Sequence, residues 1–363
     1  YEYVVKHLDV LLAQNFRMVV LDEAHYIKNY SAKRSKASVA LAQKAERAVL
    51  LSGTPALARP IELLQQLVAL HPKFFYLKWY GERYCTDTTG RQFGKYRGAT
   101  NVEELHAVLR SGIMIRRLKK DVLTQLPAKR RQQVFLQLPE KSRRAVKALQ
   151  GKMNQLRAAV AASGQDFSGV RAEHQKLLTS LYVASGGAKV EAVQEYVKML
   201  LEAETKFLIF GHHQEVLDGI ERTLRAAKTR FIRIDGRTAQ GVRGDLVRQF
   251  QEDSGVLVAV LSFGAAAVGL TLTSASTVVM AELTWVAGTL IQAEDRVHRL
   301  GQPQSVNIHY LHAQGSIDDI IWQSVQSKLE VVGKMLNGVN DSIGINSSTR
   351  HDSGSGALYR HLK

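Results

Sequence analysis

The fold is decided by two stretches, Met18-Val-Val-Leu-Asp-Glu-Ala-His25 and Ala48-Val-Leu-Leu-Ser-Gly-Thr-Pro55. Each begins with four apolar residues that are typical of a buried strand, and each strand runs straight into a polar loop. Strands that alternate with helical patterns, as they do over residues 1–138, indicate a parallel sheet covered by helices. Ligands bind to such sheets at the carboxyl ends of the strands, so both loops are candidate site loops.

A second alternating series follows from residue 186. A helical pattern from Ile317 to Leu336 closes this series. We therefore predict a second α/β lobe at residues 186–336 and, from its Gly, Ser and Asn content, a flexible tail at 337–363. The apolar strands of the second lobe are predicted at 207–210, 231–234, 256–260, 277–280 and 306–311.

The two series are separated by residues 139–185, which are rich in Ala, Lys, Arg and Gln. Apolar residues recur there at three- and four-residue steps from Val146 to Val160, which predicts an amphipathic helix. A break at Ser163-Gly164 precedes a second helix, and we interpret Ser185-Gly186-Gly187 as a hinge. The first lobe, at residues 1–138, would thus be joined to the second by a helical bridge at 139–185.

The composition indicates a polyanionic partner and excludes several classes of protein. A formal net charge of +16 and a pI near 9.8 create a positive field that attracts nucleic acid. The single cysteine, Cys85, excludes an internal disulfide and a thiolate metal cage. The longest apolar run, 256–261, is too short to cross a bilayer, and the start lacks the signal-peptide order. Because the sequence opens in the middle of a helical pattern, we expect a piece of a longer protein.

The loop after the first strand carries a pair of carboxylates, Asp22 and Glu23. Phosphoryl transfer depends mainly on positioning and charge neutralisation, and such a pair can supply both beside a nucleoside triphosphate. On this interpretation Asp22 holds Mg²⁺ through water, and Glu23 orients or deprotonates the attacking water. The alternative is that both carboxylates are solvated or cap the next helix.

The loop after the second strand is Ser52-Gly53-Thr54-Pro55. Its hydroxyl groups are positioned to hydrogen-bond Asp22 or His25 and so to sense the nucleotide. The alternative is a turn with a helix cap. The order and separation of the two loops are those of a helicase-type core, which favours the functional interpretation.

Gln292, Arg296 and Arg299 recur at helix spacing on one predicted helix that runs to Arg299, so their side chains would share one face. If the two lobes close, the guanidinium groups on that face would meet the triphosphate and stabilise charge on the transferring phosphoryl group. The alternative is a surface ion-pair cluster with Glu294 and Asp295, which would contribute little.

Basic clusters are the candidates for contact with the DNA backbone. Lys129, Arg130 and Arg131 lie beside the junction of the predicted lobes and would neutralise phosphates without reading bases. The alternative is an ordinary solvated face. Trp285 is positioned to stack on a base, although large aromatic residues more often belong to a core.

The segment QAEDRVHRLGQ, at residues 292–302, resembles the last helicase motif of the Swi/Snf-type DNA translocases of superfamily two. RNA helicases of the same superfamily usually end this motif in Gly-Arg-x-Gly-Arg rather than in His-Arg-x-Gly-Gln. Residues 21–29, 51–55 and 234–236, with Arg243, agree in order with further motifs of the family. The resemblance covers roughly the whole chain up to Leu336.

Finer features are similar to the HepA-related annealing helicases within that family. They are RRLKKDVL at 116–123 leading into QLPAK at 125–129, KFLIFGHH at 206–213, and AELTW at 281–285. The resemblance implies two RecA-like lobes that use ATP and Mg²⁺ to move along duplex DNA, and in this branch that motion rewinds or remodels forked DNA. It further implies a nuclear protein whose protein partners bind other regions.

The resemblance also assigns roles to residues that spacing alone does not single out. Gly269 belongs to the motif that links nucleotide to DNA, and with His25 and Gln292 it completes the predicted nucleotide site. Trp285 is placed near DNA by its motif. The residues implied to face the DNA backbone are Asp235, Gly236, Thr238 and Arg243.

Three departures put parts of the pattern in doubt. Ser276 stands where the family commonly has Asp, and Val286-Ala287 replace the usual Asn-Pro, which affects the expected strength of coupling. No Gly-x-x-x-x-Gly-Lys-Ser/Thr loop occurs in the sequence, so we expect the chain alone to bind ATP poorly and to hydrolyse very little. The alternatives that stay open are a catalytically silent DNA-binding module, an RNA helicase, and a chromatin remodeller that acts on nucleosomes.

Overall fold

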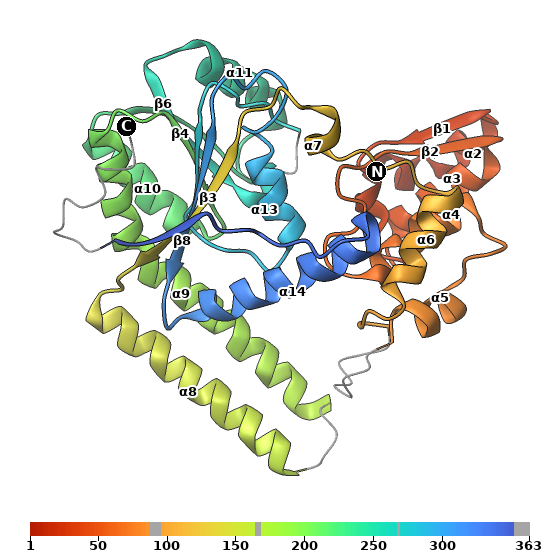
Figure 1. Ribbon diagram of the computed structural model, residues 1–363, viewed down its shortest axis with the longest axis horizontal. Coiled ribbons are helices and arrows are strands. Elements are labelled where there is room, and N and C mark those ends of the chain that lie inside the picture. The colour runs from red at the N-terminus through yellow and green to blue at the C-terminus, as the bar shows by residue number, and fades with distance from the viewer. Residues whose placement is uncertain (87–95, 164–167, 267–268, 352–363) are drawn as a thin grey trace. The chain divides into compact units, whose positions relative to one another are not determined.

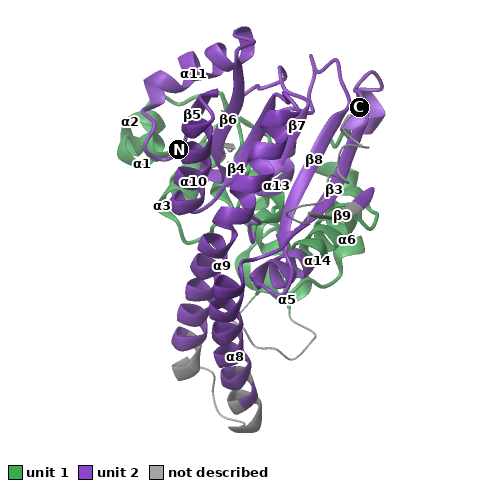
Figure 2. Ribbon diagram, turned by 90° about the vertical axis from the view of Figure 1, so that its left-hand side faces the viewer, with its two compact units in different colours: residues 1–118, 286–288, 325–343 green, residues 119–285, 289–324, 344–363 purple. Residues whose placement is uncertain are grey.

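The computed structural model of the chain describes residues 1–86, 96–163, 168–266 and 269–351. They form two compact units, which Figure 2 shows in different colours. Unit 1 contains residues 1–118, 286–288 and 325–343, and unit 2 contains the remaining residues. Among the described residues, no helix is both long and apolar enough to cross a membrane.

Unit 1 contains a two-stranded parallel sheet, β1 (Met18–Leu21) and β2 (Arg47–Leu50). The predicted strands at 18–21 and 48–51 are thus confirmed to within one residue. Val19 and Leu21 of β1 are buried because they pack against the apolar face of the helix that connects the two strands. The helices of this unit are α1 (Glu2–Lys6), α2 (Leu8–Ala13), η1 (Ala24–Ile27), α3 (Lys33–Lys44), η2 (Pro60–Leu63), α4 (Leu64–Leu70), α5 (Leu77–Tyr84) and α6 (Val102–Gly112).

A second hydrophobic cluster of unit 1 gathers helices that are distant in sequence. Leu64 of α4, Tyr80 of α5 and Leu105 of α6 are almost completely buried in it. Met335 and Leu336, from the end of α14 (Ile317–Asn337), belong to the same cluster. The closing helix that the sequence predicts is confirmed as a helix, and its last turns complete the core of unit 1.

Unit 2 contains a seven-stranded, entirely parallel sheet in the order β5-β6-β4-β7-β8-β3-β9 (Figure 2). The central strands read as continuous apolar runs because parallel sheets are covered on both faces. The α/β fold class with parallel sheets that the sequence predicts is confirmed. The strands are β3 (Lys129–Leu136), β4 (Phe207–Gly211), β5 (Arg230–Ile234), β6 (Val256–Ser262), β7 (Thr277–Met280), β8 (Val306–Ala313) and β9 (Ser347–His351).

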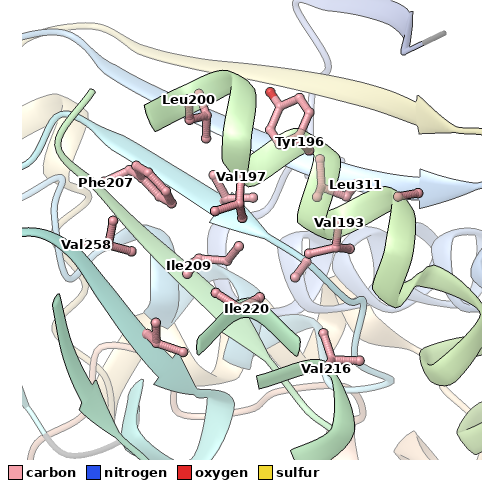
Figure 3. Packing of buried hydrophobic residues seen from close by; sticks show 14 of the residues in the cluster. Val193, Tyr196, Val197, Leu200, Phe207, Ile209, Val216, Ile220, Val258 and Leu311 are labelled. Atoms are coloured by element: carbon pink, nitrogen blue, oxygen red, sulfur yellow. The ribbon is translucent and has the colours of Figure 1, made fainter. Parts of the chain in front are cut away.

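One face of this sheet is covered by α9 and α10 (Figure 3). Val193 and Val197 of α9 meet Ile209 of β4 and Ile220 of α10 in a fully buried cluster. A long antiparallel pair, α8 and α9, extends from the unit (Figure 1). The helices of unit 2 are α7 (Lys119–Val122), α8 (Glu140–Ser163), α9 (Ser168–Glu202), α10 (Gln214–Ala226), α11 (Gln240–Glu252), α12 (Phe263–Ala266), most of α13 (Ala287–Glu294) and the first part of α14, to residue 324.

Two strands lie outside the positions that the sequence predicts for them. Residues 129–136, predicted in the first lobe, form β3 and pair with β8, because Val134 and Leu136 are buried in the core of the unit 2 sheet. Residues 347–351, predicted in a flexible tail, form β9 and pair with the other edge of β3. The side-chain oxygen of Asn346 accepts a hydrogen bond from Arg131 N at 2.7 Å, which fixes the start of this last strand.

The predicted hinge at 185–187 is also wrong, because α9 runs through it without a break. A Cβ atom on Gly186 would lie 2.6 Å from His213 Nδ1 and 2.8 Å from Glu282 Oε1. The glycine is therefore required for close packing of a helix, and not for bending of the chain. The predicted break falls after Ser163, where α8 ends, and Gly164 lies outside the described residues.

Candidate functional site

The carboxylate loop follows β1 in unit 1 and has an unusual backbone. Glu23 has φ 49° and ψ 49°, a left-handed conformation that non-glycine residues adopt rarely and mostly at functional sites. Glu23 N donates a hydrogen bond to Asp22 Oδ1 at 2.9 Å, and Tyr1 Oη donates to Asp22 O at 2.7 Å. This conformation leaves the Asp22 side chain exposed and turns Glu23 toward the buried His25.

His25 joins the two predicted site loops. Its Nδ1 lies 3.2 Å from Ser52 Oγ and 3.2 Å from Glu23 Oε2, and Ala24 N donates to Leu51 O at 2.8 Å. The predicted contact between the hydroxyl loop and His25 is therefore confirmed. Burial lowers the pKa of His25, and the Glu23 carboxylate opposes this effect only in part. The imidazole is neutral at pH 7, with its Nδ1 proton toward the carboxylate, which can only accept.

The loop after β2 has further contacts within unit 1. Ser52 Oγ accepts a hydrogen bond from Thr54 N at 3.2 Å, and Gly53 O accepts one from Arg116 Nη1 at 3.3 Å. Arg116 Nε also donates to Asn337 Oδ1 at 2.9 Å, and burial lowers the pKa of this guanidinium group. The sequence alone does not single out Arg116 as a neighbour of this loop, because the two segments are 63 residues apart.

The carboxylates fit the magnesium role that the sequence predicts. Among the described residues, no three His, Cys, Asp or Glu side chains gather into a cage for a metal ion. Mg²⁺ does not need such a cage, because it keeps several waters and is usually bound by one or two carboxylates together with substrate phosphates. Asp22, which is exposed and next to Glu23, has the oxygen ligands that this mode of binding requires.

The arginines of unit 2 lie in a different local structure from the predicted one. Helix α13 ends at Glu294, so Arg296 and Arg299 follow it in a succession of turns, and the prediction of one shared helical face with Gln292 is wrong. Arg296 N donates to Ala293 O at 3.2 Å, as in a tightening last turn. We call residues 295–299 the arginine turn.

Arg296 contacts the segment that contains the predicted nucleotide-coupling glycine. Its Nη1 donates to Leu270 O at 3.3 Å, and Leu272 N donates to Arg296 O at 3.0 Å. Gly269, directly before Leu270, has φ +53°, a value that favours glycine. Arg296 is 8% exposed, whereas Gln292 and Arg299 are partly exposed. The structure thus places Leu270 and Leu272, just after Gly269, against the arginine turn.

Two residues of the predicted DNA-binding cluster at 129–131, Lys129 and Arg131, form ion pairs inside unit 2. Lys129 Nζ lies 2.8 Å from Glu294 Oε2, and Arg131 holds both oxygens of the same carboxylate at 2.7 and 2.8 Å. Their charges are paired with a buried carboxylate in this structure, and contact of Lys129 and Arg131 with DNA stays a prediction. Arg130 points away and is exposed. The alternative stated for Arg296 and Arg299, a surface ion-pair cluster with Glu294 and Asp295, is also wrong, since Glu294 is completely buried.

The predicted backbone-facing loop after β5 is held together by its own side chains. Asp235 Oδ1 accepts from Arg237 N at 2.8 Å, and Thr238 Oγ1 accepts from Asp235 N at 3.0 Å. Burial acts to raise the pKa of Asp235, but hydrogen bonds from Arg237 N and Arg233 lower it overall. Arg243 donates to the carbonyl oxygens of Asp235 and Thr238 at 3.2 and 3.1 Å. These contacts shape the loop and leave Gly236 exposed at its tip.

Trp285 lies beside a buried polar cluster of unit 2. The rings of Tyr182 and Trp285 are 6.4 Å apart, and Tyr182 Oη donates to Leu283 O at 2.8 Å. Glu282 accepts hydrogen bonds from His212 N and His213 N at 2.7 and 2.9 Å. Trp285 is therefore anchored on one side by packing and remains partly exposed.

These features match one family. Residues 1–182 match the SNF2-related domain, and residues 188–301 match the helicase conserved C-terminal domain. The chain belongs to the SNF2-related family, which confirms the Swi/Snf-type assignment.

Curated relatives agree with this assignment. The chain is 45% identical over 344 residues to the DNA annealing helicase and endonuclease ZRANB3 of Mus musculus, an alignment that covers 93% of this chain and 31% of the relative. It is 44% identical over 333 residues to the SWI/SNF-related matrix-associated actin-dependent regulator of chromatin subfamily A-like protein 1 of Xenopus laevis, covering 90% and 33%. The chain spans about a third of the length of these relatives. Among solved structures, the C-terminal part of the Fun30 ATPase domain is similar, with a TM-score of 0.48 and 20% identity over 56% of this chain and 91% of that one.

Proposed function

We propose that this chain is the motor core of an ATP-dependent translocase on double-stranded DNA that rewinds or remodels forked DNA. The proposal is supported by membership of the SNF2-related family and by similarity to ZRANB3, a relative that is named as a DNA annealing helicase. The observation that carries it is that Glu23 and Ser52 both contact one ring nitrogen of the buried His25. A loop that positions water beside a phosphate is thereby joined to a loop that senses it.

Each predicted site residue of unit 1 has one role in this proposal. Asp22 holds Mg²⁺ through water, and the metal neutralises charge on the phosphate oxygens when it is bound. Glu23 orients the attacking water and accepts its proton, and the neutral His25 holds the Glu23 carboxylate in position. Ser52, Gly53 and Thr54 report the state of this site to the rest of the unit.

The residues of unit 2 complete the motor. Arg296 and Arg299 neutralise the transferring phosphoryl group, an effect on the order of a thousandfold or more in turnover. Gln292 and Gly269 contribute to the nucleotide site. The DNA backbone is contacted by the loop from Asp235 to Arg243, by Arg130 and by Trp285. We place the protein in the nucleus, with protein partners recruited by other regions.

The test is ATP turnover by a longer form of the protein that carries a phosphate-binding loop ahead of residue 1. We expect forked DNA to stimulate turnover more than linear duplex, and RNA not to stimulate it. Glu23→Gln should lower stimulated turnover on the order of a hundredfold or more. Glu46→Gln is the matched control, because Glu46 is an exposed glutamate of unit 1 whose ion pair with Arg17, at 3.3 Å, is exposed as well.

The outcomes separate the alternatives. Turnover that survives Glu23→Gln contradicts the role of this carboxylate. DNA binding without turnover by any nucleic acid indicates a silent binding module, and stimulation by RNA indicates an RNA helicase. Stimulation by nucleosomes above that by forked DNA indicates a chromatin remodeller.

A further inference from the structure

The Glu294 carboxylate, at the end of α13, is the centre of a buried charge cluster. It is 0% exposed and accepts hydrogen bonds from Lys129 Nζ at 2.8 Å, from Arg131 Nε and Nη2 at 2.7 and 2.8 Å, and from Tyr310 Oη at 2.6 Å. Burial acts to raise the pKa of Glu294, but the charges of Lys129 and Arg131 outweigh it and lower the pKa to about 2. The carboxylate is therefore ionised, and it ties the end of α13 to β3.

The arginine turn beyond Glu294 is bound to the same stretch of chain. Lys119 Nζ lies 2.8 Å from Asp295 Oδ2 and donates to His298 O at 3.2 Å. His298 Nε2 lies 2.9 Å from Pro127 O, to which it donates, and Lys129 Nζ lies 3.6 Å from Asp295 Oδ1. Burial lowers the pKa of His298, so the ring is a neutral donor at pH 7. Residues 119–131, which we call the strap, thus contact the turn on both sides of Arg296.

These contacts help to determine where Arg296 lies. Residues 295–299 lie beyond the end of α13, and their backbone hydrogen bonds are mixed. Asp295 N and His298 N each bond the carbonyl oxygen four residues back at 3.0 Å, whereas Arg296 N bonds Ala293 O, three residues back, at 3.2 Å. Glu294, Asp295 and His298 tie the turn to the strap, and Arg296 itself is bonded to Leu270 and Leu272. Buried ion pairs contribute little net stability, and their best-attested use is to select one arrangement over others.

The strap follows directly on Leu118, the last residue of the first run of unit 1. We propose that the strap positions Arg296, with Glu294 and His298 as positioning residues, and that it transmits displacement of the preceding chain to the arginine. This inference rests on the proposed role of Arg296 in phosphoryl transfer. A strap of this kind would align Arg296 with the transferring phosphate only when the chain ahead of it is correctly placed.

The first test is Lys119→Met, assayed as DNA-stimulated ATP turnover in the longer protein at saturating DNA. Lys119 is partly exposed, so the variant should fold normally. We expect kcat to fall on the order of tenfold to a hundredfold, as for a misplaced catalytic group, while the KM for ATP stays within about twofold. Lys119→Arg should restore most of the rate. The control is Lys120→Met, the same loss of charge at the next, exposed residue of α7, with kcat unchanged.

A double-mutant cycle tests whether Lys119 acts through the turn. If it does, Asp295→Asn added to Lys119→Met should lower kcat little further than either change alone, whereas independent effects would multiply. Glu294→Gln should lower kcat at least as much as Lys119→Met. If Glu294→Gln does not fold, Lys119→Met still tests the strap.

Arg296→Ala separates this inference from the proposed function. If Arg296→Ala leaves kcat intact, the role of the arginine fails. If Arg296→Ala lowers kcat but Lys119→Met does not, the role of Arg296 in phosphoryl transfer is supported and the positioning role of the strap is contradicted. A fall in kcat equal for Lys119→Met and Lys120→Met would also overturn the strap, because it would reflect charge alone.

Discussion

Gly186→Ala should destabilise unit 2, although alanine is ordinarily the better residue in a helix. Gly186 lies inside α9, and a Cβ atom there would meet His213 Nδ1 at 2.6 Å and Glu282 Oε1 at 2.8 Å. Those two atoms are themselves 2.6 Å apart in a hydrogen-bonded pair. Glu282 is 2% exposed and also accepts the backbone N–H groups of His212 and His213, so it cannot move aside without losing them.

The magnitude follows from three contributions. Forcing a methyl group into a filled site costs about 1–3 kcal/mol. Disrupting a hydrogen bond to a buried charged group costs about 1.5–3 kcal/mol. The gain in helix propensity from Gly to Ala offsets about 1 kcal/mol. We therefore expect a net loss of about 2–4 kcal/mol, which at an m-value of about 2–3 kcal/mol/M lowers the urea midpoint by roughly 1 M.

The assay is urea unfolding followed by far-ultraviolet circular dichroism, with two glycines of the same helical pair as controls. Gly151 lies inside α8 with nothing within 4 Å of its Cβ position, so Gly151→Ala should stabilise by about 0.5–1 kcal/mol. A Cβ atom on Gly187 would lie 3.1 Å from Glu215 Oε2, the end of an exposed and flexible side chain. Gly187→Ala should therefore be near neutral.

A specific pattern of results would refute this reasoning. If Gly186→Ala is as stable as the unchanged protein while Gly151→Ala gains stability, then Gly186 does not pack against His213 and Glu282. That result would return the segment 185–187 to the hinge that its sequence suggests. A loss at Gly186 alone, with a gain at Gly151, is the expected signature of close packing.

Two further predictions concern buried titratable groups of unit 2. Burial lowers the pKa of His309 to about 4, below its unfolded value of about 6.5. The free energy of unfolding should therefore be highest above about pH 6.5 and fall by up to about 3 kcal/mol as the pH drops toward 4. In urea melts at a series of pH values, His309→Gln should make the free energy of unfolding less dependent on pH over that range. Lys189, 1% exposed, lies 2.8 Å from Asp318 Oδ2, so Lys189→Met should cost about 3–5 kcal/mol by leaving a buried carboxylate without its partner. Adding Asp318→Asn should recover most of that loss in the same melts, because the amide oxygen can still accept from Ala313 N, and no recovery would show that the pair is not the cause.

The parts of the fold that follow from local patterns could be predicted from the sequence. The strands at 18–21 and 277–280 are found at those positions, because a short apolar run ending in polar residues needs only burial to become a strand. Assignment of strands to sheets failed where it depends on distant partners. β3 is 177 residues from β8 in the chain, as the pairing of Lys129 with Val306 shows, and nothing near β3 identifies that partner.

The structural role of a glycine is ambiguous in the sequence, because glycine serves both for unusual backbone angles and for close packing. At Gly269 it permits φ +53°, which agrees with a loop motif. At Gly186 it permits two side chains from the segments after β4 and β7 to approach a continuous helix. The sequence Ser185-Gly186-Gly187 is the same for a hinge and for a packing notch, and only the positions of His213 and Glu282 decide between them.

The site shows the same division between local and distant causes. The contact of His25 with Ser52 could be predicted because both follow neighbouring parallel strands, whose carboxyl ends must meet. The local structure around Arg296 could not. The spacing of Gln292, Arg296 and Arg299 satisfies a helix, yet the helix ends at Glu294, whose carboxylate is held by Lys129, 165 residues earlier in the chain.

That early end of α13 has a consequence for how the arginine would work. A side chain on a regular helix is positioned by the backbone and moves only with the whole helix, whereas one in a turn moves with the few side chains that hold it. Six residue pairs between residues 119–131 and Glu294, Asp295 and His298 hold this turn. Arg296 is bonded to Leu270 and Leu272 as well, so its position depends on two stretches of chain. The comparison of Lys119→Met with Lys120→Met measures the dependence on residues 119–131.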